Sequence, residues 1–447
     1  MLERLRAGQL AGSKRLNLSC GLREFPREIF NLADTLEILD LSGNALSSLP
    51  DDLPRLHKLR ILFCSNNLFT ALPEILGQCP QLSMVGFKAN RIHTVPAAAI
   101  PPALRWLILT DNNIAELPAG IGRCTQLQKL MLAGNQLQTL PPELAGCTKL
   151  ELLRISANRF TALPDWLFEL PQLAWLAYAD NPFCDENEDA ALAHTSISHI
   201  DWEKLQIQQK LGEGASGEIY QALWRREECD QHVAVKIFKG ALTSDGLPHS
   251  EIAACICAGE HPNLISMHGK ISGHPSKTNA LVLALMDARF RNLAAPPSLE
   301  SCTRDIYPDD TAFTLRSAIR IAQGIAAVAR HLHERGIMHG DLYAHNIMYG
   351  EQGEAILGDF GAASFFDTGN LRQAEALQRI EVRAFGCLLE ELIARCNMPS
   401  DSLHLLHQLV DLQERCAQEK ITVRPLFAEI HQVLENLQVD LTAGDAI

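Results

Sequence analysis

The sequence lacks several features that would assign it to a broad class of protein. It contains no run of about 18 apolar residues, so no membrane-spanning helix is expected. It has no excess of basic charge: the formal net charge is −14, which argues against a nucleic-acid-binding protein. The N-terminal stretch MLERLRAGQLAGSKRL has no apolar centre and is not typical of a secretory signal.

Disulfide and zinc frameworks are also missing from the pattern of the 13 cysteines. Their number is odd and no C-x-x-C pair occurs, while Cys255 and Cys257 stand too close together for a zinc knuckle. We therefore expect reduced cysteines and a cytoplasmic location. The length of 447 residues and the ordinary balance of 47% hydrophobic and 21% charged residues predict two or three globular domains.

The first third of the sequence is periodic. Leucines recur in the pattern L-x-x-L-x-L-x-x-N-x-L, which is typical of leucine-rich repeats. Successive asparagines are 23, 23, 22, 23, 23 and 23 residues apart, at Asn44, Asn67, Asn90, Asn112, Asn135, Asn158 and Asn181. In such repeats each leucine is buried against the next repeat, and the asparagine amide pairs with backbone groups at the turn. The pattern breaks at DNPFCDENED, so we expect a leucine-rich-repeat domain over residues 1–188.

The strand face opposite the leucine core is unusually apolar. Alternation along each strand places this face on the concave surface of the solenoid. We expect an exposed apolar stripe here that binds a protein partner, at Ile61, Phe63, Met84, Trp106, Ile108, Met131 and Trp175. The alternative is that another part of the chain covers it.

A glycine-rich motif opens the second half of the chain. KLGEGASGEIYQA carries Gly212, Gly214 and Gly217 in G-x-G-x-x-G spacing, and HVAVKIFKG with Lys236 follows. Dinucleotide-binding folds share this glycine spacing, but they require a helix directly after it. Here the flanking segments have the pattern of two strands.

The motifs that follow resemble, in order, those of the eukaryotic-type protein kinase family. After V-A-V-K come Glu251 in an apolar helical stretch, then HPNL, HGDLYAHN, D-F-G at Asp359 to Gly361, and RPLFAEI. The resemblance covers about residues 204–437, with 189–203 as a linker and 438–447 as a tail. The predicted fold is therefore an α/β leucine-rich-repeat solenoid followed by an α+β bilobal kinase-like domain.

The resemblance implies ATP and Mg²⁺ as cofactors and a role for each matching residue. Lys236 would hold the α- and β-phosphates, Glu251 would orient Lys236, and Asp341 would accept or orient the proton of the attacking hydroxyl. Asn346 and Asp359 would bind Mg²⁺. The nucleotide-binding positions are Gly212, Gly214, Gly217, Ile219, Ala234 and Lys236.

The sequence also departs from the family pattern. Gly340 stands where most protein kinases have an arginine that pairs with a phosphorylated activation loop, and Glu381 replaces an aspartate. Tyr343 and His345 fill the positions where serine/threonine kinases carry lysine and tyrosine kinases carry arginine. The prediction is an ATP-dependent protein kinase, with serine or threonine as acceptor, whose repeats recruit a partner or substrate. A nucleotide-binding pseudokinase scaffold and a small-molecule phosphotransferase, whose catalytic loop also has the form H-G-D-L-x-x-x-N, are the alternatives.

Overall fold

The computed structural model describes residues 1–193, 195, 197–214, 216–227, 229–240, 242–397 and 403–444. The chain divides into two compact units. The first comprises Met1–Leu173 and Asn181–Phe183, and the second comprises Ala174–Asp180 and Cys184–Ile447. In the described part of the chain, no helix combines the length and the apolar character that crossing a membrane requires.

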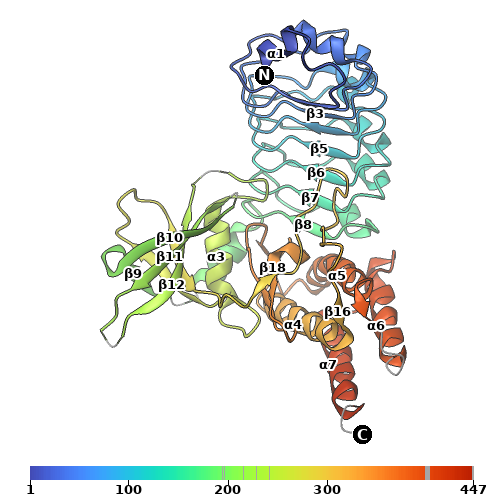
Figure 1. Ribbon diagram of the computed structural model, residues 1–447. Coiled ribbons are helices and arrows are strands. Elements are labelled where there is room, and N and C mark those ends of the chain that lie inside the picture. Colours follow the sequence, from blue (N-terminus) through green and yellow to red (C-terminus); the bar gives the residue numbers. More distant parts are fainter. Residues whose placement is uncertain are drawn as a thin grey trace. The chain divides into compact units, whose positions relative to one another are not determined.

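The first unit is a leucine-rich-repeat solenoid (Figure 1). Its short strands pair in parallel in the order of the sequence, with Leu39, Leu62, Val85, Leu107, Leu130 and Leu153 in register and fully buried. After α1 (Leu2–Arg6), the strands are β1 (Arg15–Asn17), β2 (Ile38–Asp40), β3 (Ile61–Phe63), β4 (Met84–Gly86), β5 (Trp106–Ile108), β6 (Lys129–Met131) and β7 (Leu152–Arg154). The return segments form 3₁₀ helices at Arg27–Leu32, Leu53–Arg55, Glu74–Gln78, Ala97–Ala99, Ala119–Arg123, Pro142–Gly146 and Asp165–Glu169.

The repeated asparagines form a hydrogen-bonded ladder along the solenoid. The side-chain Nδ2 of Asn135 donates to the carbonyl oxygens of Leu109 and Leu132, both at 2.9 Å, and its Oδ1 accepts the Ile114 N–H at 3.0 Å. Asn67, Asn112 and Asn158 repeat this pattern. The ladder satisfies backbone groups that stacking removes from water, as the sequence pattern predicts.

The concave face differs from the predicted exposed stripe. Ile61 and Met84 are 3% and 2% exposed, so the prediction that they face solvent is wrong. Phe63, Trp106, Ile108 and Met131 are half-buried. The side chains pack on one another across strands, because Phe63 covers the space above Gly86 and the indole Nε1 of Trp106 lies 3.3 Å from Met131 Sδ.

The second unit begins with β8 (Trp175–Ala177) and α2 (Asp185–Ala193), followed by a sheet of six strands among the described residues. The strand order is β10-β11-β12-β14-β13-β9. The strands are β9 (His199–Asp201), β10 (Leu205–Glu213), β11 (Gly217–Trp224), β12 (Gln231–Phe238), β13 (Met267–Ser272) and β14 (Ala280–Ala284). The edge strand β9 lies in the predicted linker and runs parallel to β13. Helix α3 (Pro248–Ala258) packs Ile252 and Ile256 against Phe238 and Leu281 of the sheet.

The rest of the second unit is mainly helical (Figure 1). Thr314 caps the N-terminus of the long helix α4, because its hydroxyl accepts the Ser317 N–H at 3.1 Å. The helices are α4 (Leu315–Glu334), α5 (Leu371–Ile393), α6 (Leu403–Cys416) and α7 (Phe427–Gly444). Short strands lie before and between these helices: β15 (Arg291–Asn292), β16 (Phe313–Thr314), β17 (Ile337–Met338), β18 (Ile347–Tyr349), β19 (Ala355–Leu357), β20 (Ser364–Phe365) and β21 (Cys396–Asn397). The predicted tail overlaps the last turns of α7, and residues 445–447 lie outside the described residues.

Candidate active site

The glycine-rich motif forms the turn between β10 and β11. The Gly214 N–H donates to the Gly217 carbonyl at 2.9 Å, which closes the turn. A Cβ atom at Gly217 would lie 2.5 Å from the Ile237 carbonyl oxygen, so only glycine fits this position against β12. Among the described residues, a Cβ atom at Gly212 or Gly214 would meet nothing within 4 Å. The turn therefore leaves open space beside two glycines, while the third is required by strand packing.

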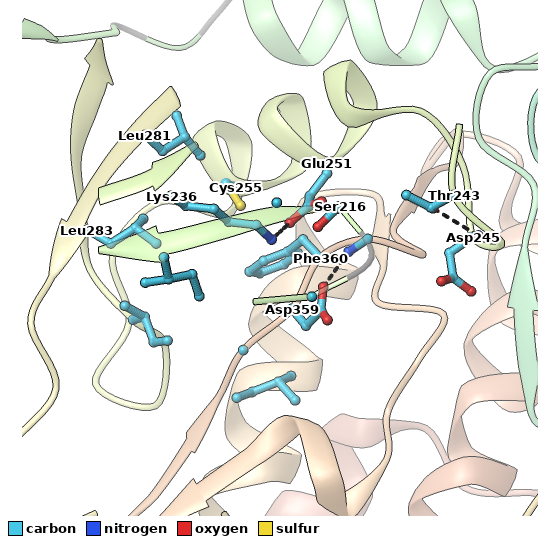
Figure 2. Close-up of a pocket in the computed structure, with 17 residues that line it drawn as sticks. Ser216, Lys236, Thr243, Asp245, Glu251, Cys255, Leu281, Leu283, Asp359 and Phe360 are labelled. Atoms are coloured by element: carbon cyan, nitrogen blue, oxygen red, sulfur yellow. Dashed lines mark hydrogen bonds and ion pairs between the residues drawn. The ribbon is translucent and has the colours of Figure 1, made fainter. Parts of the chain in front are cut away.

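Lys236 and Glu251 form a buried ion pair that links β12 to α3 (Figure 2). Their side chains are 13% and 2% exposed. Burial lowers the pKa of Lys236, but the negative charges of Glu251 and Asp359 outweigh it and raise the pKa overall. The lysine is therefore held as a fixed cation on β12, an interior strand of the sheet.

Asp359 lies opposite Lys236 in a strained turn. Its backbone φ is +56°, a left-handed conformation that costs aspartate less than most other residues except glycine, and its Oδ1 accepts the Gly361 N–H at 3.1 Å. The ring of the next residue, Phe360, packs against His339 with ring centroids 5.4 Å apart. These contacts hold the Asp359 carboxylate near Lys236 (Figure 2).

One cavity of about 200 Å³ joins these groups. Its apolar wall includes Ile219, Leu281, Leu283 and Leu357. The predicted site residues among its lining are Gly214, Gly217, Ile219, Lys236, Glu251 and Asp359. The cavity is thus apolar on one side and lined on the other by one lysine and carboxylates.

Asp341 and Asn346 form a second group of predicted site residues, next to this cavity rather than in its lining. Asn346 Nδ2 donates to Asp341 Oδ2 at 2.8 Å, and the Asn346 carbonyl accepts the Gly358 N–H at 2.9 Å. Gly358 immediately precedes Asp359, so backbone pairing brings the two groups together. Gly212 and Ala234, the remaining predicted residues, lie in β10 and β12 but do not belong to the described lining.

A buried network holds the loop that carries Asp341. The Gly340 N–H donates to Glu381 Oε1 at 2.7 Å, and Glu381 Oε2 lies 2.6 Å from His333 Nε2. Burial raises the pKa of Glu381, but the hydrogen bond and positive charge of His333, the charge of His339 and the Gly340 N–H together outweigh it, so the pKa is lowered overall. Gly340 has φ +74°, and a Cβ atom there would lie 2.5 Å from the Ala362 carbonyl oxygen. Neither arginine nor any other side chain fits at this position.

Two residues of the site, Asp305 and Trp175, cannot be placed from the sequence. Asp305 is buried and lies 2.7 Å from Nδ1 of His345. Trp175 was predicted to line an exposed binding face, and this prediction is wrong. It is 2% exposed and stacks on Tyr343, with ring centroids 4.1 Å apart and an interplanar angle of 5°. Asp305 and His345 are 40 positions apart in the sequence, and Trp175 and Tyr343 are 168 positions apart. No local sequence pattern therefore predicts these contacts.

The arrangement defines a class of protein: a chain in which a protein-kinase-type domain follows leucine-rich repeats. The family model "Protein tyrosine and serine/threonine kinase" matches residues 205–388. Leucine-rich-repeat models match residues 35–56, 102–160 and 125–183. The chain therefore combines leucine-rich repeats with a protein tyrosine and serine/threonine kinase domain, as the sequence motifs predict.

Relatives of both halves are known. A probable serine/threonine-protein kinase of Dictyostelium discoideum is 34% identical over 40% of this chain and 10% of its own length. The mouse leucine-rich repeat and calponin homology domain-containing protein 1 is 33% identical over 27% of this chain and 18% of its own. The tyrosine-protein kinase Abl of Drosophila melanogaster is 27% identical over 54% of this chain and 16% of its own. The chain thus spans less than a fifth of each of these three relatives.

Proposed function

We propose that the second unit is an ATP-dependent protein kinase that transfers a phosphoryl group to a serine or threonine hydroxyl. The observation that carries the proposal is the buried Lys236–Glu251 ion pair, which faces Asp359 across one cavity. Phosphoryl transfer depends mainly on positioning and on stabilising charge. A lysine held as a cation beside a carboxylate supplies both.

The residues present suit Mg-ATP. Asp359 and Asn346 offer the carboxylate and amide oxygens that Mg²⁺ prefers, and Lys236 would hold phosphate oxygens. The open space beside Gly212 and Gly214 leaves backbone accessible to phosphates, while the apolar wall suits a flat base. When bound, Mg-ATP supplies the phosphoryl group to be transferred.

On the acceptor side, Asp341 accepts or orients the proton of the attacking hydroxyl. Asn346 holds the Asp341 carboxylate through its 2.8 Å hydrogen bond. His345, close to the carboxylates of Asp305, Asp341 and Asp359, provides a positive charge where this loop has neither the lysine nor the arginine of the family pattern. Burial lowers the pKa of His345, but the hydrogen bond with Asp305 and the negative charges of the three carboxylates together outweigh it and raise the pKa overall.

A labelling experiment tests this proposal. The purified full chain is incubated with Mg²⁺, ATP labelled on the γ-phosphate, and peptides that contain serine, threonine or tyrosine. Label on serine or threonine that disappears in Asp359→Ala supports the proposal. The matched control is Asp367→Ala, because Asp367 is exposed and makes the same short turn, accepting the Gly369 N–H at 2.7 Å. ATP binding without transfer would favour a pseudokinase scaffold, and label confined to small molecules would favour a small-molecule phosphotransferase.

The repeats recruit a protein partner or substrate in this proposal. The half-buried side chains of Phe63, Trp106, Ile108 and Met131 support it, since they are apolar positions on β3, β5 and β6, and Phe63 and Ile108 flank Gly86 of β4. Once a partner is identified, Trp106→Ala should weaken its direct binding to the full chain, whereas Trp166→Ala, in a return segment, should not. Equal affinity of wild type and Trp106→Ala would contradict recruitment by this face.

A further inference from the structure

The segment Ala174–Asp180 belongs to the second unit although it continues the repeat pattern in sequence. Its first contact is with the loop that carries Asp341. The indole of Trp175 stacks on Tyr343, and its Nε1 donates to the Leu342 carbonyl at 3.2 Å. Leu342 and Tyr343 directly follow Asp341, so Trp175 fixes both a backbone group and a ring beside the residue proposed to orient the acceptor.

The middle of the segment contacts the backbone before and after this loop. The Leu176 carbonyl oxygen would lie 2.7 Å from a Cβ atom at Gly340, so the segment passes directly over that glycine. The Tyr178 N–H donates to Ser364 Oγ at 3.0 Å. Ser364 is fully buried in β20, which pairs with β17 and follows the turn of Asp359. The segment therefore also holds the strand that leaves the Asp359 turn.

The end of the segment contacts the helix that carries Glu251. Asp180 Oδ1 accepts the Ser250 hydroxyl at 2.6 Å and lies 2.6 Å from His249 Nε2, and its Oδ2 accepts the Leu247 N–H at 3.1 Å. The Asp180 side chain is 5% exposed. A carboxylate at a helix N-terminus is stabilised by the helix dipole and by unpaired backbone N–H groups. Asp180 thus anchors the first turn of α3, where Glu251 follows Ser250.

We propose that Ala174–Asp180 is a positioning segment for phosphoryl transfer, with Trp175 and Asp180 as its positioning residues. This inference rests on the proposed kinase function. Three parts must be aligned for transfer: the loop of Asp341, the turn of Asp359 and the helix of Glu251. One extended stretch of seven residues holds all three through side-chain and backbone contacts, so none of them moves independently. The segment also fills the space that a side chain at position 340 would need, and the glycine at that position has no side chain.

The two positioning residues act on different steps. Trp175 holds the acceptor side, so Trp175→Ala should lower kcat by about tenfold or more and leave the KM for ATP within about twofold. Asp180 holds the helix whose Glu251 orients Lys236, so Asp180→Asn should raise the KM for ATP several-fold. Asparagine tolerates the left-handed backbone of Asp180, whose φ is +60°, so the substitution removes the charge without added strain.

The test uses the full chain and two matched controls. Asp111→Asn changes an exposed aspartate with the same φ of +60° at the equivalent repeat position, and Trp166→Ala removes a half-buried indole nine residues before Trp175. Trp175→Phe keeps a ring that can stack and should recover part of the kcat. Amide hydrogen exchange gives a readout that does not depend on activity. Trp175→Ala should accelerate exchange at Leu342 and Tyr343, and Asp180→Asn should accelerate it at Leu247.

The outcomes separate this inference from the function on which it rests. An inactive wild type would overturn the kinase proposal, while the exchange pattern would still decide whether the segment holds these elements. An active wild type with Trp175→Ala and Asp180→Asn matching their controls in kcat, KM and exchange would overturn the positioning segment alone. A uniform loss of melting temperature with unchanged kinetic constants would assign the segment a purely structural role and would equally overturn it.

Discussion

The buried carboxylate of Asp305 forms an ion pair with the half-buried ring of His345 at the end of the loop that carries Asp341. One carboxylate oxygen of Asp305 lies 2.7 Å from His345 Nδ1, and the other accepts the His345 backbone N–H at 2.9 Å. The pair fixes both the ring and the backbone of His345. It also places a titratable cation in a loop where the family pattern expects lysine or arginine.

This pair predicts a pH dependence of stability. The folded pKa of His345 is raised, so the pair stabilises the fold below the unfolded pKa of about 6.5, and this contribution is lost as pH rises through the folded pKa. Asp341 and Asp359 also face His345 and act in the same direction. Asp305→Asn should therefore destabilise the chain most at acidic pH. Urea unfolding of both proteins between pH 5.5 and 9, roughly spanning this window, measures the difference, and a constant difference would contradict the prediction.

The carboxylate of Glu381 predicts a large loss of stability on truncation. Glu381→Ala leaves the Gly340 N–H and His333 without their buried partner, so the free energy of unfolding should fall by about 3–5 kcal/mol at pH 7. The folded pKa of Glu381 is lowered, so its contribution is present above the unfolded pKa of about 4.3 and is lost as pH falls through the folded value. Chemical denaturation measures both effects.

The control for Glu381 is Glu390→Ala. Glu390 pairs with Arg304 at 2.6 Å but its side chain is 57% exposed, so its loss should cost at most about 1 kcal/mol. If the two variants lose similar stability, Glu381 does not anchor the loop as described.

We predict that replacing Gly340 by the arginine of the family pattern lowers both stability and activity. Gly340→Ala combines a left-handed φ with contacts of 2.5 and 2.7 Å to two carbonyl oxygens, so unfolding free energy and kinase activity should both fall, and Gly340→Arg should be worse. Gly273→Ala separates the two causes, because Gly273 has φ +72° and open space around it. That control should lose only about 1–2 kcal/mol. A tolerated Gly340→Arg would contradict the tight packing at this position.

We predict that loss of the Glu251 charge impairs the use of ATP without unfolding the chain. Glu251→Gln keeps the side-chain shape but removes the charge that holds Lys236, so kcat/KM for ATP should fall by about 10–100-fold. Steady-state kinetics measure this, and circular dichroism checks the fold. Wild-type kinetics in this variant would contradict the role of the ion pair.

The sequence predicts much of the fold because its strongest signals are local. The asparagine spacing of 23 residues is also the register of the strands, and the one spacing of 22 leaves Met84 paired with Trp106. The ordered kinase motifs likewise predict the Lys236–Glu251 pair and the neighbourhood of Asp341, Asn346 and Asp359. The edge strand β9 was missed because three residues, His199–Asp201, carry too little pattern to indicate a strand.

The remaining part of the site could not be predicted because it depends on contacts between distant positions. Alternation places Trp175 and Trp106 on the same strand face, yet one is buried on Tyr343 and the other is half-buried beside Met131. Periodicity assigns a face and says nothing of what covers that face. Gly340, Tyr343 and His345 depart from the family pattern, and each contacts a partner that no motif names: Leu176, Trp175 and Asp305.

The asparagine ladder also has a consequence for how such a gene can change in length. Asn67 donates to Leu41, 26 residues earlier, and accepts from Leu46, 21 residues earlier; Asn135 and Asn158 use the same offsets. Duplication or loss of one whole unit therefore recreates every one of these bonds at the new junction. A deletion of half a unit would instead leave buried amide and carbonyl groups without hydrogen-bond partners. Related genes are expected to differ in this region by whole repeats.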